Sequence, residues 1–130
     1  MIMPGRAANM GDGWEGRRRR GPGFDWCIVR LGTRGIVSRI EVDTNHFKGN
    51  YPDRCLIEVC DAPDAGPGSA FDPGAQAWRT LLPESKLQAH TRHEFEAELT
   101  GGGQPCTHAR LSIFPDGGVS RLRLWGRPVA

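Results

Sequence analysis

The chain has 130 residues, a length suited to one domain, and a net charge of only +2. So small a charge provides no overall field to bind nucleic acid or an anionic membrane, and no apolar run approaches the ~20 residues of a membrane helix. The first ten residues lack the apolar core of a secretory signal, so we expect a cytoplasmic protein.

Short apolar or alternating segments recur along the chain, separated by many of its 18 glycines and 10 prolines. No window keeps the apolar spacing of a long amphipathic helix. The predicted fold is therefore all-β, an antiparallel β-sandwich of the jelly-roll kind. The expected strands are residues 25–31, 37–43, 55–60, 77–82, 93–98, 108–114 and 120–125.

Apolar and polar residues alternate clearly in two of these segments, residues 37–43 and 120–125. In residues 37–43, Ile40 and Val42 fall on one face while Glu41 and Asp43 fall on the other. This pattern is typical of a sheet that is covered on one side. Residues 61–74, which hold three prolines and three glycines, are expected to form one long loop.

The four cysteines are even in number, which would suit two disulfides in a small secreted protein. Cys27, Cys55 and Cys60 instead lie in apolar strand-like runs, and no CxxC pair or Cys/His cluster suits zinc. We predict free, mostly buried thiols, no metal and no cofactor.

Residues 11–20 form the first polar segment, GDGWEGRRRR, which precedes the first expected strand and should be a loop. Its four arginines suit a solvated basic surface or a nucleic-acid patch. An anion site is the third interpretation, because the planar fork of arginine binds a carboxylate through two hydrogen bonds.

Residues 43–50 form the second polar segment, DTNHFKGN, directly after an expected strand. His46 can exchange a proton near neutral pH, and a strand end can hold such a group in place. The alternative is a turn in which Asp43 and Asn45 cap backbone groups and Phe47 plugs the end of the sandwich.

Residues 114–119, FPDGGV, are predicted to form a hairpin turn with Asp116 at its centre. The turn accounts for this motif almost fully. The one functional role that it leaves open is that Asp116 and Arg121 border a pocket. His90, His93 and His108 have no ligand spacing and suit a surface or strand-capping role. GxSxG, P-loop and HExxH motifs are absent from the sequence, so pattern alone indicates no named chemistry.

Five stretches of the sequence, residues 10–20, 25–32, 40–50, 78–87 and 114–126, have features in a shared order. Taken together, they resemble the allantoicase family. The resemblance implies a jelly-roll sandwich similar to galactose-binding domains, and hydrolysis of allantoate to ureidoglycolate and urea in purine breakdown.

Two departures from the family pattern stand out. Allantoicases usually carry two repeats, whereas residues 11–130 form a single repeat, more like the second, after an N-terminal segment or linker over residues 1–10. Gly16 stands where the family usually has threonine. We therefore expect that full activity needs a second repeat or a homo-oligomer.

The resemblance also implies roles for residues of the polar segments. His46 with Glu15 or Asp43 would carry out acid/base catalysis. The substrate-binding residues would be Trp14, Arg17, Arg18, Thr44, Phe47, Asn50, Asp116 and Arg121. The alternative is a non-catalytic module that binds a small ligand or an assembly partner, since a fold does not dictate a function.

Overall fold

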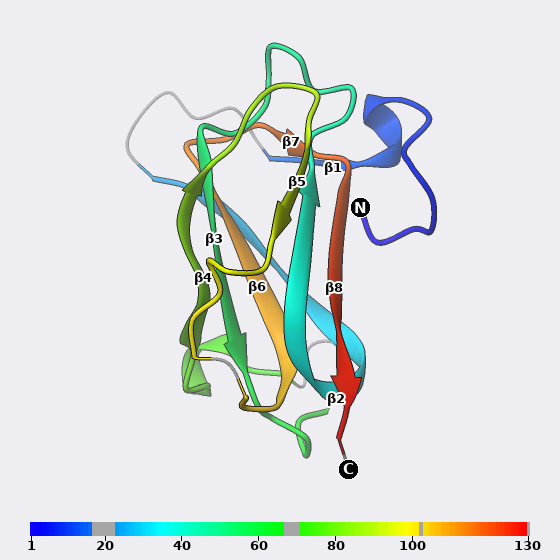
Figure 1. Cartoon of the computed structure of the whole chain (residues 1–130). Coiled ribbons are helices and arrows are strands. Elements are labelled where there is room, and N and C mark those ends of the chain that lie inside the picture. The colour runs from blue at the N-terminus through cyan, green and yellow to red at the C-terminus, as the bar shows by residue number, and fades with distance from the viewer. Residues whose placement is uncertain (17–22, 67–70, 102, 130) are drawn as a thin grey trace.

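The computed structural model describes residues 1–16, 23–66, 71–101 and 103–129, and these form a two-layered antiparallel sandwich (Figure 1). The fold class predicted from the sequence is confirmed, and helix in the described residues is confined to the 3₁₀ segments η1 (Met10–Asp12) and η3 (Pro73–Ala75). The main strands are β2 (Asp25–Asp43), β3 (Arg54–Cys60), β4 (Arg79–Lys86), β5 (Arg92–Phe95), β6 (Cys106–Phe114) and β8 (Arg121–Pro128).

Strand β2 belongs to both layers. Its first half pairs with β6, which continues to β3 and β4, and its second half pairs with β5 and β8. The strand turns back on itself at the bend between Arg30 and Gly35, where the register shifts (Figure 1). The sequence predicts two separate strands here, and the structure joins them through this bend.

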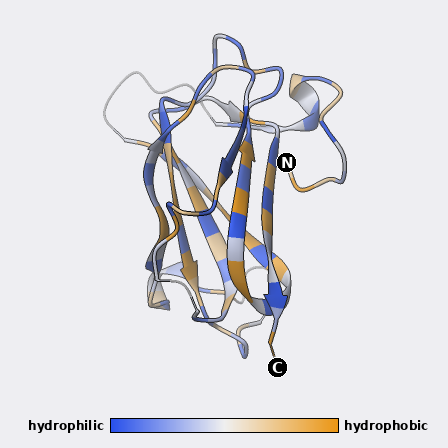
Figure 2. Cartoon of the chain, in the orientation of Figure 1, coloured by the Kyte–Doolittle hydropathy of each residue, from blue (hydrophilic) through white to orange (hydrophobic). Residues whose placement is uncertain are grey.

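The core lies between the layers and is built by alternation. Ile40, Val42, Ile57 and Leu111 are fully buried, and Leu56 and Glu58 on either side of Ile57 are partly exposed. The alternation is incomplete at the end of β2, where Glu41 and Asp43 are buried as well. Figure 2 shows this as alternating apolar and polar bands along the central strands. The two faces of each layer are therefore distinct, as a one-sided sheet requires.

Residues 114–119 do not form the predicted hairpin. The turn is present, with a cis Phe114–Pro115 peptide and Gly117 at a φ of 122°. However, β6 pairs with the first half of β2 while β8 pairs with the second half, so the segment crosses from one layer to the other. Within it, β7 (Gly118–Val119) pairs with β1 (Trp14–Glu15), two short strands that the sequence analysis missed.

All four cysteines are free, three of them buried and Cys27 partly so. Burial raises the pKa of the Cys27 thiol to about 11 and that of Cys55 to about 12. Within the described residues, no helix has the length and apolar character needed to span a membrane.

Candidate functional site

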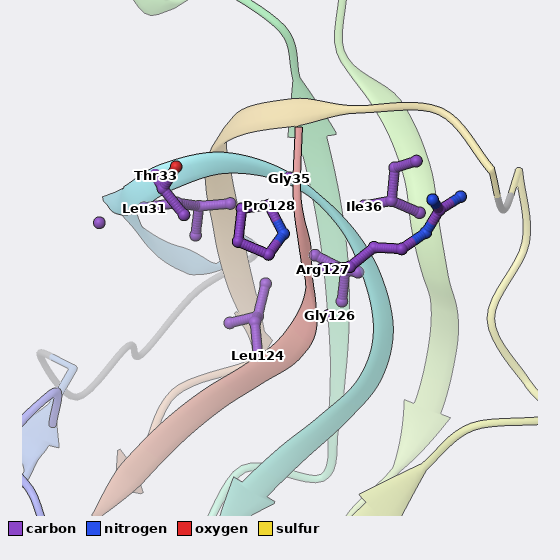
Figure 3. Close-up of a pocket in the computed structure, with 10 residues that line it drawn as sticks. Leu31, Thr33, Gly35, Ile36, Leu124, Gly126, Arg127 and Pro128 are labelled. Atoms are coloured by element: carbon purple, nitrogen blue, oxygen red, sulfur yellow. The ribbon is translucent and has the colours of Figure 1, made fainter. Parts of the chain in front are cut away.

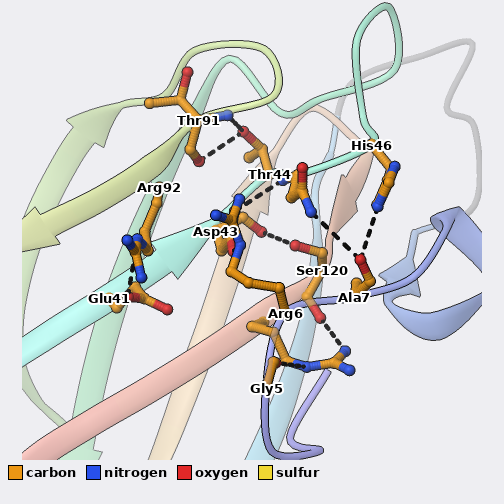
Figure 4. Close-up of polar contacts among 12 residues, drawn as sticks. Gly5, Arg6, Ala7, Glu41, Asp43, Thr44, His46, Thr91, Arg92 and Ser120 are labelled. Atoms are coloured by element: carbon orange, nitrogen blue, oxygen red, sulfur yellow. Dashed lines mark hydrogen bonds and ion pairs between the residues drawn. The ribbon is translucent and has the colours of Figure 1, made fainter.

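Residues 11–16 of the first polar segment and residues 43–50 of the second lie at the same end of the sandwich, the one where β2 finishes at Asp43. Residues 117–120 link the two segments through backbone hydrogen bonds: Gly16 donates to the carbonyl of Gly117 at 2.7 Å, Gly118 donates to that of Asn50 at 2.9 Å, and Ser120 donates to that of Asp43 at 2.7 Å. We call this the Asp43 end, and it is where β1, β7 and the N-terminal residues meet (Figures 1 and 4).

Asp43 lies fully buried at this end. Its Oδ1 accepts a hydrogen bond from the backbone of Asn45 at 2.9 Å, and its Oδ2 lies 2.8 Å from Nε of Arg6 (Figure 4). The carboxylate therefore caps the turn after β2 and is paired with a cation from the N-terminal residues. A buried carboxylate needs such a partner to remain ionised.

His46 follows in a left-handed backbone conformation, with a φ of 73°. Its Nε2 lies 2.8 Å from the carbonyl of Ala7, and its backbone N–H donates to Nδ1 of His90 at 2.9 Å (Figure 4). A carbonyl only accepts, so Nε2 carries the ring proton. In the neutral ring Nδ1 is then free to accept a proton.

Glu15 and Asn50 are brought together from the two polar segments. The amide Nδ2 of Asn50 donates to Oε1 of Glu15 at 3.1 Å. Glu15 is exposed, while its neighbour Trp14 packs against the core. Strand β1 therefore fixes the backbone of Glu15, and the amide of Asn50 holds its carboxylate, which is open to solvent.

Arg121 is 1% exposed and serves as a clamp on the N-terminal residues. Its guanidinium donates to the carbonyls of Gly5 and Ser120 and to the carboxylate of Asp12 at 2.8 Å, and it also contacts the carbonyl of Asp12. The hydrogen bond from Arg121 holds the pKa of the Asp12 carboxyl below its usual value.

Thr44 and Phe47 are buried and have structural contacts. The Thr44 hydroxyl lies 2.6 Å from the carbonyl of Gln88 and accepts from the backbone of Thr91 at 3.0 Å. Phe47 is fully buried against Gly118, where an added Cβ would lie 1.8 Å from the ring. This matches the interpretation of the segment as a plug for the sandwich end.

The predicted site residues thus form two groups. Asp43 and His46 contact residues 6–7, and Glu15 contacts Asn50. Among the described residues, no hydrogen bond or ion pair joins the two groups directly. Asp116 lies in the turn before β7, and Arg17 and Arg18 lie outside the described residues.

The sequence analysis missed the contribution of residues 5–12. Arg6, Ala7 and Asp12 provide the contacts that cover Asp43, His46 and Arg121. Their sequence carries no strand or motif pattern, and only Arg6 and Asp12 offered a signal, as charges near the start of the chain. Nor do the described residues gather three His, Cys, Asp or Glu side chains in the way that a metal ion requires.

Cavities surround the bend of β2, at the opposite end of the sandwich. One of about 230 Å³ lies between this bend and the end of β8, lined by residues such as Leu31, Gly35, Leu124 and Pro128 (Figure 3). A neighbouring hollow of about 470 Å³ is lined by Ile2 and residues of β2 and β8. We call this region the bend end.

The architecture defines a galactose-binding-like jelly roll. A solved structure of this fold, the C-terminal domain of a chitobiase from Bacteroides fragilis, is similar with a TM-score of 0.66 at 14% identity, over 95% of this chain and 78% of that one. At so low an identity the likeness concerns the fold alone.

The chain belongs to the allantoicase repeat family, whose model matches residues 1–129. It is 56% identical over 126 residues to a probable allantoicase of Burkholderia mallei, covering 97% of this chain and 37% of that protein. The crystal structure of allantoicase from Saccharomyces cerevisiae matches with a TM-score of 0.79 at 35% identity, over 96% of this chain and 35% of that one. The chain therefore spans little more than a third of the length of these relatives.

Proposed function

We propose that this chain is one repeat of an enzyme that hydrolyses allantoate to ureidoglycolate and urea in the cytoplasm. The observation that carries the proposal is the match of nearly the whole chain to proteins named allantoicase. The polar groups at the Asp43 end supply side chains that the reaction requires.

The reaction breaks a C–N bond at the carbon of allantoate that carries two ureido groups. Water provides the oxygen that replaces the leaving nitrogen, and a proton must reach that nitrogen as urea departs. We assign this proton transfer to His46 and Glu15. The ring of His46 has a fixed tautomer through Ala7, and Glu15 is solvent-exposed, so both groups can exchange protons.

Asp43 is the alternative to Glu15 that the resemblance implies for acid/base catalysis, and we propose a supporting role for it. Because it is fully buried and bonded to Arg6 and Asn45, we propose that it holds the turn that presents His46. The turn keeps the backbone of His46 in its left-handed conformation, which is costly for most residues, and so fixes where the imidazole starts.

Substrate binding is assigned to groups around the same end. Arg17, Arg18 or Arg121 would bind the carboxylate, and Thr44 and Asn50 the ureido groups. For Arg121 and Thr44 this requires that substrate replace a present contact, with Asp12 and Gln88 respectively. Trp14 and Phe47 would form the apolar wall, with Asp116 at the border.

We further propose that a second repeat or another copy completes the site. The two groups of residues are not joined directly, and the chain spans only about 37% of its bacterial relative. A facing surface would exclude water and fix the substrate between Glu15 and His46, and misplacement by ~1 Å can cost about 100-fold in rate.

The test measures urea release from allantoate by this chain and by a full-length relative that carries the same substitutions. His46→Asn keeps a residue that tolerates the left-handed backbone, and we expect kcat in the full-length protein to fall about 100-fold or more. Glu15→Gln should have a similar effect. Lys48→Gln, an exposed change in the same loop, is the matched control.

Unchanged turnover in the His46→Asn and Glu15→Gln variants would overturn the residue assignments. If this chain binds allantoate or a sugar but the full-length relative releases no urea, the alternative of a non-catalytic galactose-binding-like module is correct. Full turnover by a dilute, monomeric single repeat would overturn the need for a second one.

A further inference from the structure

A polar cavity of about 150 Å³ lies at the bend end, separate from the residues assigned above. Its lining comes from three places: the bend of β2 at residues 30–34, the loop that follows β3, and the start of β6. The residues of the last two places are Ala62, Pro63, Ala65, Thr107 and His108.

Arg30 and His108 are cross-strand partners in this cavity. They are directly opposite in the register of β2 and β6, so their side chains leave the same face of the sheet as neighbours. Arg30 is exposed, and among the described residues its side chain has no hydrogen bond or ion pair. Its guanidinium therefore has all of its donors available.

His108 is a built part of the cavity, only 5% exposed. Its Nδ1 lies 2.7 Å from the Thr107 hydroxyl, and Phe71 stacks on its ring at a centroid distance of 4.2 Å. The Thr107 hydroxyl accepts from the backbone of Ala62 at 2.8 Å and also lies 3.4 Å from the carbonyl of Cys60, a second acceptor for its proton. The ring of His108 is therefore held in place by a hydrogen bond on one side and an aromatic stack on its face.

The charges around the cavity add up to one unpaired cation. Arg34 and Asp61 form a two-pronged ion pair, at 2.9 Å and 2.7 Å, that joins the bend to the loop and neutralises both charges. Burial, with the nearby charge of Arg30, lowers the pKa of His108, so the ring is neutral at pH 7. Of the residues that line the cavity, Arg30 is then the one that carries an unpaired charge.

We infer that this cavity binds a small carboxylate monoanion. The fork of Arg30 matches the two oxygens of a carboxylate, and the neutral ring of His108 lines the cavity without adding charge. The ion pair and the loop provide a wall that keeps the ligand small. The inference does not depend on the proposed hydrolysis, because it uses none of the residues assigned to that reaction.

The experiment titrates the uniformly ¹⁵N-labelled 130-residue chain with sodium acetate at constant ionic strength and follows its backbone amides by NMR. Acetamide, which has the same shape without the charge, is the ligand control. We expect saturable shifts with acetate at residues 31–34, 62–65 and 107–108, and none that saturate with acetamide.

Arg30→Gln should weaken acetate binding at least tenfold while the rest of the spectrum is unchanged. The acetate affinity of Arg30→Lys, which keeps the charge but not the planar fork, should lie between those of the parent chain and Arg30→Gln. Arg30→Lys takes the place of Arg30→Gln if the glutamine variant does not fold. Arg39→Gln is the matched control, because Arg39 stacks over Trp125 on the other layer. Shifts that do not saturate, that are equal for acetamide, or that persist unchanged in both Arg30 variants would overturn the inference.

Discussion

At the Asp43 end, polar side chains are buried and bonded to one another or to the N-terminal residues. Asp43, Thr44 and Arg121 are each almost fully buried, and the structure gives each of them partners. At the bend end, by contrast, β2 turns back and leaves cavities, two of them lined by Arg30, whose side chain has no hydrogen bond or ion pair among the described residues.

The difference separates two uses of polar residues. A dense polar segment such as residues 43–50 closes the end of a sandwich, where backbone groups of the turn need partners. A single arginine on a strand, with no motif around it, faces a hollow. The density of polar residues in a sequence therefore does not locate the open space that a ligand needs.

The largest expected effect comes from filling space at the tightly packed end. In Gly118→Ala the new Cβ would lie 1.8 Å from Cε1 of the buried Phe47, so the ring must move. We expect a loss of about 3 kcal/mol in the free energy of unfolding, measured with guanidinium chloride. Gly32→Ala at the bend end has no atom within 4 Å of its Cβ and should change stability by less than about 0.5 kcal/mol. Equal losses of stability in Gly118→Ala and Gly32→Ala would contradict the difference in packing between the two ends.

The next effect concerns the clamp on the N-terminal residues. Arg121→Met leaves the buried carbonyl of Ser120 and that of Gly5 without this donor, which should cost about 2 kcal/mol. Hydrogen exchange should become faster for residues 1–12. Arg123→Met, which removes a more exposed guanidinium that also bonds Gly5, should cost less than half as much. Unchanged exchange in Arg121→Met would show that these residues are held by other contacts.

A smaller loss is expected from Thr44→Val, a change of nearly equal volume. It removes the acceptor for the Thr91 backbone and the donor for Gln88 in a buried setting, at a cost of about 1 kcal/mol by thermal unfolding. Thr33→Val is the control at the bend end, because the Thr33 hydroxyl is exposed. A loss as large in the control would contradict the distinction between the two ends.

The fold was largely predictable from the sequence, because alternation such as that of Ile40 and Val42 is a local property of the strand that carries it. The bend that joins two predicted strands into β2 was not, since pairing partners decide it. The contact of Glu15 with Asn50 and those of Arg6 and Ala7 join residues far apart in the chain, and so no local pattern indicates them.

The smallest expected effect is on the pH dependence of stability, and it concerns one carboxylate at each end of the sandwich. A hydrogen bond from Arg121 lowers the pKa of the Asp12 carboxyl below its usual value, and one from Arg34 does the same for Asp61. A carboxyl whose pKa is lower in the folded protein stabilises it fully above the unfolded value. That contribution is lost as the pH falls below about 4 through the folded value. Asp12→Asn and Asp61→Asn should therefore each flatten the fall in stability on the acid side.

Salt then distinguishes the two carboxylates. Arg121 is only 2% exposed as a side chain, whereas Arg34 is 30% exposed, so solvent ions screen the pair at the bend end more strongly. In about 0.5 M NaCl the difference between Asp61→Asn and the parent chain should shrink, while that of Asp12→Asn persists. The measurement is the unfolding midpoint in guanidine-free thermal scans from pH 3 to pH 6, with and without salt. If salt removes both differences equally, the clamp at the Asp43 end is as open to solvent as the ion pair at the bend.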